Sequence, residues 1–171
     1  MNDVYHYRQR KDAFFRDDPS SPVEDAGFEA LRYYPVTDSY IVRARVKVFD
    51  EQVRVDLATS TGESEGYLRY ARARFKLEDA THMLTLYVPL GGDPERLFIP
   101  FKDRSNGKET YAAGRYLEAA LADKNTLRLD FNYAYNPFCA YSPRYRCALP
   151  PEENHLNVAI RAGEKLYEET R

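Results

Sequence analysis

The chain has 171 residues, the usual size of one domain and too few for two full ones. Its 25 Lys and Arg residues against 27 Asp and Glu residues give a formal net charge of -2, which does not favour nucleic acid or an anionic membrane as a partner. No apolar run is long enough to span a membrane, and the first residues lack the pattern of a signal peptide. We therefore expect a cytoplasmic protein. The 15 Tyr and 9 Phe residues suit barrel walls and pocket linings as well as a core.

Residues 1–35 predict a helix and a lead-in to the rest of the chain. The stretch 4–15 contains no Gly or Pro, and its apolar side chains are spaced so that one face can lie on a core. The sequence Asp17-Asp18-Pro19 ends this helix, because proline disfavours helical backbone in the residue before it. A short helical turn is expected over 24–31.

After Pro35 the apolar side chains alternate with polar ones, which is typical of half-buried strands. Two such runs, 42–48 and 53–57, predict a β-hairpin that turns at Asp50 and Glu51.

Further strands and turns follow along the chain. Strands are expected over 67–77, 82–90, 96–101 and 125–133, whereas 116–121 fits a strand or a helix. About seven short strands without alternating helices predict a mainly β, antiparallel fold. We expect a single domain, 1–171, in which 36–171 form a split or closed barrel and the N-terminal α-helix packs on its outside.

The segment 101–117 departs from the alternating pattern and is dense in charges and hydroxyls. A nucleotide P-loop is rejected, because the glycine required five residues before Gly107 is replaced by Lys102. One interpretation is a solvated turn that leads into a strand. The other is that polar side chains of this segment hydrogen-bond a ligand and fix its orientation.

A second unusual segment covers 130–143 and continues to His155. If 125–133 is a strand, Asp130 and Asn132 lie on the same face of it, where they meet either a ligand or water.

Both cysteines, Cys139 and Cys147, belong to this second segment. Buried, inert thiols are the preferred interpretation. A zinc site of Cys139, Cys147 and His155, completed by Glu153 or a water, comes next, although the spacing matches no standard zinc motif. A disulfide and a nucleophilic cysteine activated by His155 are the remaining alternatives.

Basic residues are expected to share one face of the sheet: Arg43, Arg45, Lys47, Arg72, Arg74 and Lys76. With Tyr67 and Tyr70 interleaved, they suggest a surface for single-stranded nucleic acid. A solvated outer face with acidic neighbours is the stronger interpretation, because the whole chain is slightly acidic.

The motifs of the two unusual segments are Gly107-Lys108-Glu109-Thr110-Tyr111, Gly114-Arg115-Tyr116-Leu117, Ala134-Tyr135-Asn136-Pro137, Cys139-Ala140-Tyr141 and Glu153-Asn154-His155-Leu156. Through them the chain resembles a bacterial and archaeal family, the domain of unknown function 1684. An upstream match at Leu31-Arg32-Tyr33-Tyr34-Pro35 extends the resemblance over nearly the whole chain. The resemblance implies one domain in which the two segments belong together, and it implies no activity, cofactor or substrate. Some relatives carry lipoprotein-type export signals, which keeps a disulfide open.

Our leading hypothesis is a protein that binds a small polar or anionic molecule between the two segments. Arg115 and Lys102 would pair with an anionic group, while amides and phenol hydroxyls orient the remainder. The predicted ligand-binding residues are Lys102, Asp103, Glu109, Tyr111, Arg115, Asp130, Asn132, Tyr135, Asn136 and Tyr141.

Three alternatives stay open. The first is a hydrolase with Glu109 or Asp130 as general base near Tyr111, or a zinc enzyme built on the cysteines. The second is a flavin-binding split barrel, by analogy of fold alone, and the third is a structural or interaction module. A homodimer is also compatible with the sequence, which does not decide whether the protein is an enzyme.

Overall fold

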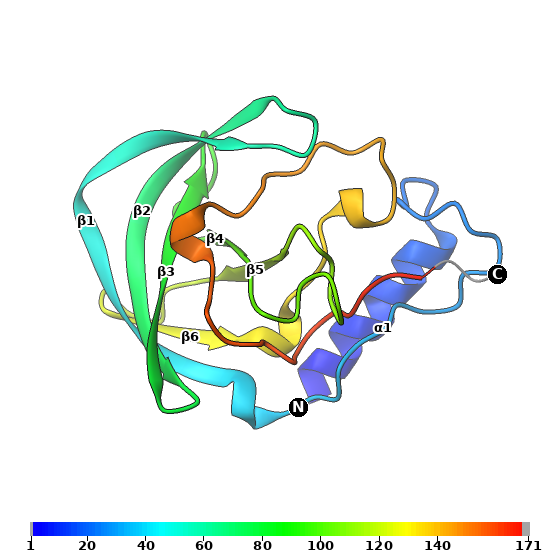
Figure 1. Ribbon diagram of the computed structural model, residues 1–171, viewed down its shortest axis with the longest axis horizontal. Coiled ribbons are helices and arrows are strands. Elements are labelled where there is room, and N and C mark those ends of the chain that lie inside the picture. The colour runs from blue at the N-terminus through cyan, green and yellow to red at the C-terminus, as the bar shows by residue number, and fades with distance from the viewer. Residues whose placement is uncertain (1, 169–171) are drawn as a thin grey trace.

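A computed structural model describes residues 2–168, and it begins with the predicted helix, α1 (Asn2–Asp17). The helix ends immediately before Asp18-Pro19, and it buries Val4, Arg8 and Phe15 against the rest of the molecule, outside the sheet (Figure 1). No helix within these residues is long and apolar enough to cross a membrane.

The helical turn expected over 24–31 is wrong. Only a tight turn forms there, in which the Asp25 carboxylate accepts a hydrogen bond from the backbone N–H of Gly27 at 2.8 Å. An Asp side chain that binds the backbone two residues further on competes with helix formation. The chain then continues in extended form to Tyr33, which pairs with Glu164.

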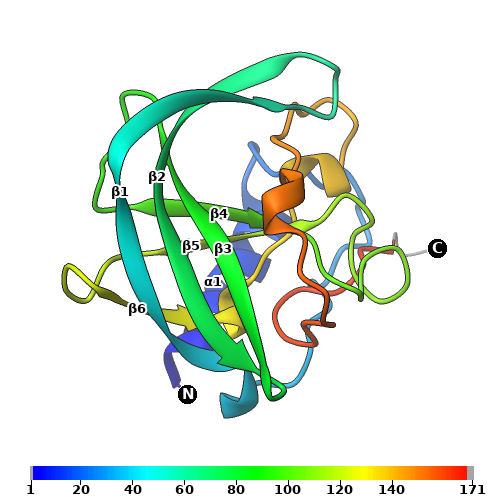
Figure 2. The same ribbon diagram turned by 60° about the vertical axis from the view of Figure 1, so that its left-hand side comes forward.

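Six strands form one antiparallel sheet that curls into a half-barrel (Figure 2). They are β1 (Ile41–Ala58), β2 (Ser64–Leu77), β3 (Ala80–Pro89), β4 (Leu97–Phe101), β5 (Arg115–Ala119) and β6 (Thr126–Asp130). Their order across the sheet is β5-β4-β3-β2-β1-β6. The prediction of a mainly β, antiparallel, barrel-like fold with an N-terminal helix is confirmed, and the ambiguous stretch 116–121 contributes a strand, β5.

The hairpin predicted within 42–57 is wrong, because both runs belong to the single strand β1. Val48 pairs with Ala71, but the next pair along the ladder joins Val53 to Arg69, so β1 contains extra residues that β2 does not match. Such a bulge shifts the alternation, so that odd-numbered side chains after it take the place of even-numbered ones before it. The shift from even-numbered to odd-numbered valines therefore indicates a bent strand, and no glycine or proline stands there to reverse the chain.

The strand predicted over 125–133 ends early, at Asp130. Its carboxylate accepts a hydrogen bond from the backbone N–H of Asn132 at 3.1 Å, which starts a 3-10 turn, η2 (Phe131–Tyr133). Asp130 and Asn132 therefore do not share a strand face, and they contact each other directly instead.

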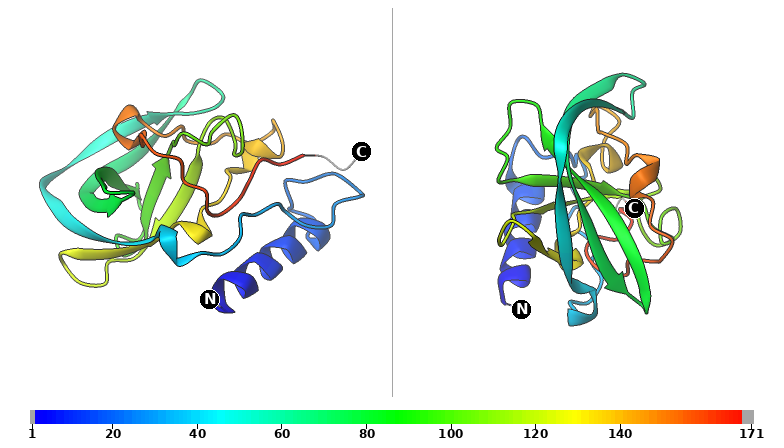
Figure 3. Two further views of the ribbon diagram at one scale, coloured as in Figure 1. Left: turned by 60° about the horizontal axis from the view of Figure 1, so that its bottom comes forward. Right: turned by 90° about the vertical axis from the view of Figure 1, so that its left-hand side faces the viewer.

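The core lies inside the curl of the sheet, and the C-terminal part of the chain covers the open side (Figure 3). Leu156, Val158, Ile160 and Ala162 alternate along this covering segment and pack on leucines of β3, β4 and β6. Because the segment is buried, its backbone needs partners, and polar side chains of the neighbouring loops supply several of them.

One such partner closes a gap in the sheet. β3 and β4 pair only at Tyr87 and Phe98, and beyond that point Asn154 takes the place of a neighbouring strand. Its carboxamide accepts from the Thr85 N–H at 2.7 Å and donates to the carbonyl oxygens of Thr85 and Pro100 at 2.9 and 2.8 Å. Asn154 sits in η4 (Glu152–Asn154) and is fully buried.

Candidate functional site

Asp103 and Arg115, two of the predicted ligand-binding residues, form an ion pair at 3.0 Å, and neither side chain is exposed. The Arg115 guanidinium also donates to the carbonyl oxygens of Ile160, Ala162 and Glu164 at 2.7, 2.6 and 3.0 Å. The second carboxylate oxygen of Asp103 accepts from the N–H groups of Ser105 and Ile160. This pair thus anchors the covering segment to the sheet.

A second buried carboxylate, Glu164, gathers three further groups. It accepts from the Lys11 ammonium, from the Tyr141 hydroxyl and from the backbone N–H of Asn136 at 2.8 Å. The Asn136 side chain donates to the Lys165 carbonyl oxygen at 3.0 Å. Tyr141 and Asn136, both predicted to bind a ligand, therefore join the second segment to the end of the chain, and Lys11 joins α1 to the same carboxylate.

Asp130 and Asn132 have a comparable structural setting. The Asn132 carboxamide is paired with the backbone of Thr37, accepting at 3.1 Å and donating at 2.9 Å, and it also donates to Asp130 at 2.8 Å. Arg8 of α1 donates to the Asn132 carbonyl oxygen at 3.3 Å.

The remaining residues of the first segment lie closer to solvent. Lys102 is half-buried and forms a backbone bridge with His155.

The Glu109 carboxylate pairs with Arg161 at 2.9 Å and accepts a hydrogen bond from the Tyr34 hydroxyl at 3.2 Å. Burial raises the pKa of Tyr34 to about 12, and the Glu109 carboxylate is the second cause of this shift. The Tyr111 hydroxyl instead contacts the Cys139 sulfur, whereas Glu109, proposed as a general base near Tyr111, contacts Arg161 and Tyr34.

Tyr135, the last of the predicted ligand-binding residues, lines a cavity of about 280 Å³, which we call the aromatic pocket. Its lining is rich in rings that come from β2, β4, β5 and the stretch from Tyr135 to Tyr145. The residues are Glu65, Tyr67, Phe98, Tyr116, Glu118, Tyr135, Pro137, Phe138, Tyr145, Arg146, Cys147 and Ala148.

The rings of this pocket contact one another in a continuous series. Tyr67 stacks on Phe98 with ring centroids 5.3 Å apart, and Phe98 meets Tyr116 edge to face at 4.7 Å. Tyr116 meets Tyr135 edge to face at 5.7 Å, and their backbones form an isolated bridge. Ring contacts and the backbone hydrogen bonds between Tyr116 and Tyr135 therefore hold this wall of the pocket together.

Polar groups occupy defined places around the pocket. The Tyr116 hydroxyl donates to the Ala148 carbonyl oxygen at 2.5 Å. Burial raises the pKa of Tyr67, of Tyr116 and of Tyr135, so these phenols stay protonated and can donate hydrogen bonds.

Three charged side chains also line the pocket. The Glu118 carboxylate lies 3.5 Å from Arg96, and Arg146 pairs with Glu63, outside the lining. The Glu65 carboxylate contributes, after burial, to the raised pKa of Tyr67. The lining therefore carries two carboxylates and one guanidinium, a net charge of -1.

The two cysteines meet at the edge of this pocket, and both are free thiols. The Cys139 backbone N–H donates to the Cys147 sulfur at 3.3 Å, and the Tyr111 hydroxyl lies 3.6 Å from the Cys139 sulfur. A hydrogen bond from the Cys147 thiol lowers the pKa of Cys139 to about 6, while the same contact and burial raise the pKa of Cys147.

The structure does not assemble the zinc set predicted from the sequence. Between residues 2 and 168, no three His, Cys, Asp or Glu side chains gather so as to hold a metal ion. The His155 ring instead contacts the Pro150 carbonyl oxygen at 3.1 Å, and Glu153 accepts from Arg69 at 2.8 Å and from Tyr87.

The aromatic pocket joins the two unusual segments, through Tyr116 of the first and Tyr135 of the second. Most of its lining, including Phe98, Phe138 and Tyr145, was not predicted from the sequence, which placed Tyr67 with the basic residues of the sheet instead. The high number of Tyr and Phe residues was the available signal, but nothing in the sequence says which rings meet.

The family described as "Protein of unknown function (DUF1684)" matches residues 26–165. A solution NMR structure of an uncharacterized protein from Haloarcula marismortui is similar over 96% of this chain and 92% of that chain, with 36% sequence identity and a TM-score of 0.77. No curated protein matches the chain.

Proposed function

The chain belongs to the DUF1684 family, and we propose that it binds a small polar molecule carrying a planar ring in the aromatic pocket. The observation that carries this proposal is a cavity of about 280 Å³ walled by rings from both unusual segments. Small-molecule sites are concave, largely apolar and furnished with a few placed polar groups. The pocket has each of these properties.

The ring series supports stacking as the main mode of recognition. Tyr67 and Phe98 are nearly parallel, with an interplanar angle of 18°, whereas Tyr116 stands at 75° to Phe98. A planar ligand ring would therefore meet ring faces on one side and ring edges on another, both of which are favourable arrangements.

The charges of the lining favour a neutral or cationic ligand here. Ring faces attract cations, and the carboxylates of Glu65 and Glu118 outnumber the guanidinium of Arg146. Arg146 is itself paired with Glu63, which leaves less of its charge for an anion.

Five of the ten residues predicted for ligand binding have one of two roles in this proposal. Tyr135 would contact the ligand directly. The buried residues Asp103, Arg115, Asn136 and Tyr141 would position the two segments that form the walls, because their side chains already hydrogen-bond within the fold.

Three ring compounds of similar size and different charge test the proposal: benzylamine, benzyl alcohol and benzoate. We expect saturable binding in ligand-observed NMR, strongest for benzylamine and weakest for benzoate. In Phe98→Leu the affinity should fall roughly 2- to 12-fold, since one ring contact contributes about 0.5–1.5 kcal/mol.

Phe49→Leu is the matched control. Phe49 is also a half-buried aromatic residue of the sheet, but it packs under Arg69 and does not line the pocket. Equal losses in both variants, or no binding by any of the three compounds, would contradict the proposal.

A further inference from the structure

Cations face one another across the outer surface of the sheet. Arg45 pairs with Arg74, Lys47 with Arg72, and Arg43 with Arg128 in the strand registers of β1, β2 and β6. Like charges placed directly opposite in an antiparallel sheet repel and destabilise it. The face expected from the sequence thus forms, with Arg128 added, and its arrangement is unfavourable for the fold alone.

Four of these cations form no ion pair in the described part of the chain, although the charge of Arg43 is felt by the exposed carboxylate of Asp123. Arg43, Arg45, Arg74 and Lys76 make no ion pair within 4 Å and no side-chain hydrogen bond there, and all four are exposed. Carboxylates reach only the margins of the face, where Glu153 lies 3.8 Å from Arg72 and Asp130 lies 3.2 Å from Arg128.

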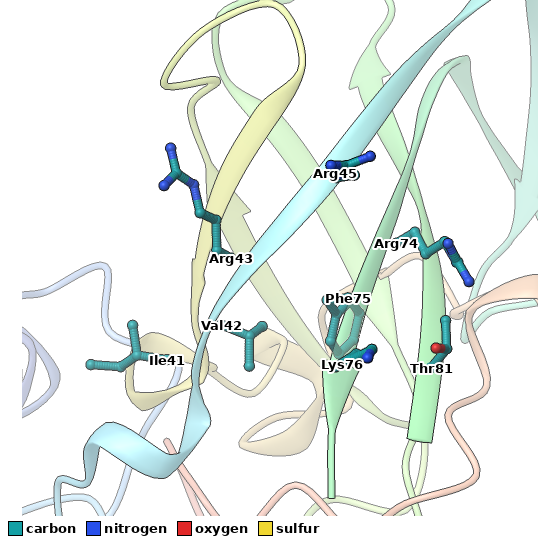
Figure 4. Close-up of a pocket in the computed structure, with 8 residues that line it drawn as sticks. All are labelled: Ile41, Val42, Arg43, Arg45, Arg74, Phe75, Lys76 and Thr81. Atoms are coloured by element: carbon teal, nitrogen blue, oxygen red, sulfur yellow. The ribbon is translucent and has the colours of Figure 1, made fainter. Parts of the chain in front are cut away.

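The four cations surround a cleft of about 500 Å³ between β1 and β2. The ladder between these strands extends only to Arg45 and Arg74. Below that pair, β1 is bonded to β6 while β2 remains bonded to β3. Figure 4 shows the strands separating, with Val42 and Phe75 in the gap.

The cleft therefore combines an apolar floor with a cationic rim. We propose that it binds a small organic anion, a phosphate monoester or carboxylate whose charged group lies between Arg45 and Arg74 and whose apolar part covers Val42. Guanidinium groups bind both kinds of anion with two parallel hydrogen bonds. The cleft shares no lining residue with the aromatic pocket, so either site can fail without the other.

Calorimetric titration at low ionic strength tests this site with octyl phosphate, kept below its micelle-forming concentration. We expect saturable binding that weakens at least 10-fold in the double variant R45Q/R74Q. Inorganic phosphate should bind more weakly than octyl phosphate, and octyltrimethylammonium should not bind. The double variant should melt at the same temperature as the wild type or higher, because its substitutions relieve a repulsion.

R54Q is the matched control, since Arg54 is an exposed arginine of β1 that pairs with Asp56 away from the cleft. It should leave the octyl phosphate affinity unchanged. Equal weakening in R54Q, equal affinity for inorganic phosphate, or tighter saturable binding of a single-stranded oligonucleotide would each overturn the proposal. The last result would assign the face to a polyanion.

Discussion

Cys139 and Cys147 differ in their surroundings although they contact each other. Cys139 is half-buried and receives hydrogen bonds from the Cys147 thiol and the Tyr111 hydroxyl, both of which stabilise its thiolate. The contact with Cys139 and burial raise the pKa of Cys147, so its own ionisation is disfavoured. One of the two thiols is thus activated at the expense of the other.

This asymmetry predicts different reactivity toward iodoacetamide. Because the pKa of Cys139 is lowered to about 6, its thiolate predominates at pH 7, and its alkylation rate should fall as the pH drops through 6. Cys147 should react slowly over the same range. Peptide mass spectrometry after timed alkylation between pH 5 and pH 9 measures both rates.

Cys147→Ala is the informative variant for this prediction. It removes the thiol that donates to Cys139, so the midpoint of Cys139 alkylation should move to higher pH. An unchanged midpoint would show that Cys147 does not set the ionisation of Cys139.

At the level of the elements, β1 shows how one strand can serve two neighbours. Its first residues, from Ile41 to Arg45, pair with β6, and its last residues, from Val53 to Ala58, pair with the start of β2. The bulge between them adds bend and twist, which a sheet needs in order to curl.

The turn between β2 and β3 carries local strain. Glu78 and Asp79 have φ angles of 51° and 59°, which are left-handed values that ordinary residues adopt at a cost of roughly 1–2 kcal/mol each. Asn-Gly is the preferred sequence for such a two-residue hairpin turn. We expect the double variant E78N/D79G to unfold at higher urea concentration, with a gain of about 1 kcal/mol.

Asn and Gly introduced at another exposed pair of residues provide a control. Glu51 and Gln52 are exposed residues of the β1 bulge without positive φ, so E51N/Q52G should not stabilise the protein. A turn variant that is no more stable than the wild type would show that the left-handed backbone carries no measurable cost here.

For the whole molecule, the buried contacts of Arg115 hold the covering segment on the open side of the half-barrel. This guanidinium connects β5 to three carbonyl groups of the covering segment and to Asp103. Glu164 makes a second connection, from the same segment to Lys11 of α1. The open side of the sheet is therefore covered by polar anchors as well as by the apolar side chains between them.

Arg115→Ala should lower the free energy of unfolding by about 3–5 kcal/mol, because it leaves the Asp103 carboxylate buried without its ion-pair partner. Arg161→Ala removes an exposed arginine that pairs with Glu109 and should cost about 0–1 kcal/mol. Denaturant unfolding of both variants compares the two. Similar small losses of unfolding free energy in both variants would mean that the buried ion pair does not stabilise the folded protein.

Much of the fold was predictable because its signals are local. The Gly- and Pro-free stretch before Asp18-Pro19 defines α1, and period-two alternation locates most strands. The β1 bulge was mistaken for a hairpin because a bulge and a turn change the phase of alternation in the same way. Only pairing with β2 and β6 distinguishes them.

The candidate site was predictable only in part. The sequence alone shows two polar segments that depart from the alternating strand pattern and a chain rich in aromatic residues. Whether Arg115 faces a ligand or Asp103, and whether Tyr67 meets Phe98, was decided by the tertiary structure alone. These contacts join residues far apart in the chain, so they depend on strand register and on how the covering segment packs, which local sequence patterns do not encode.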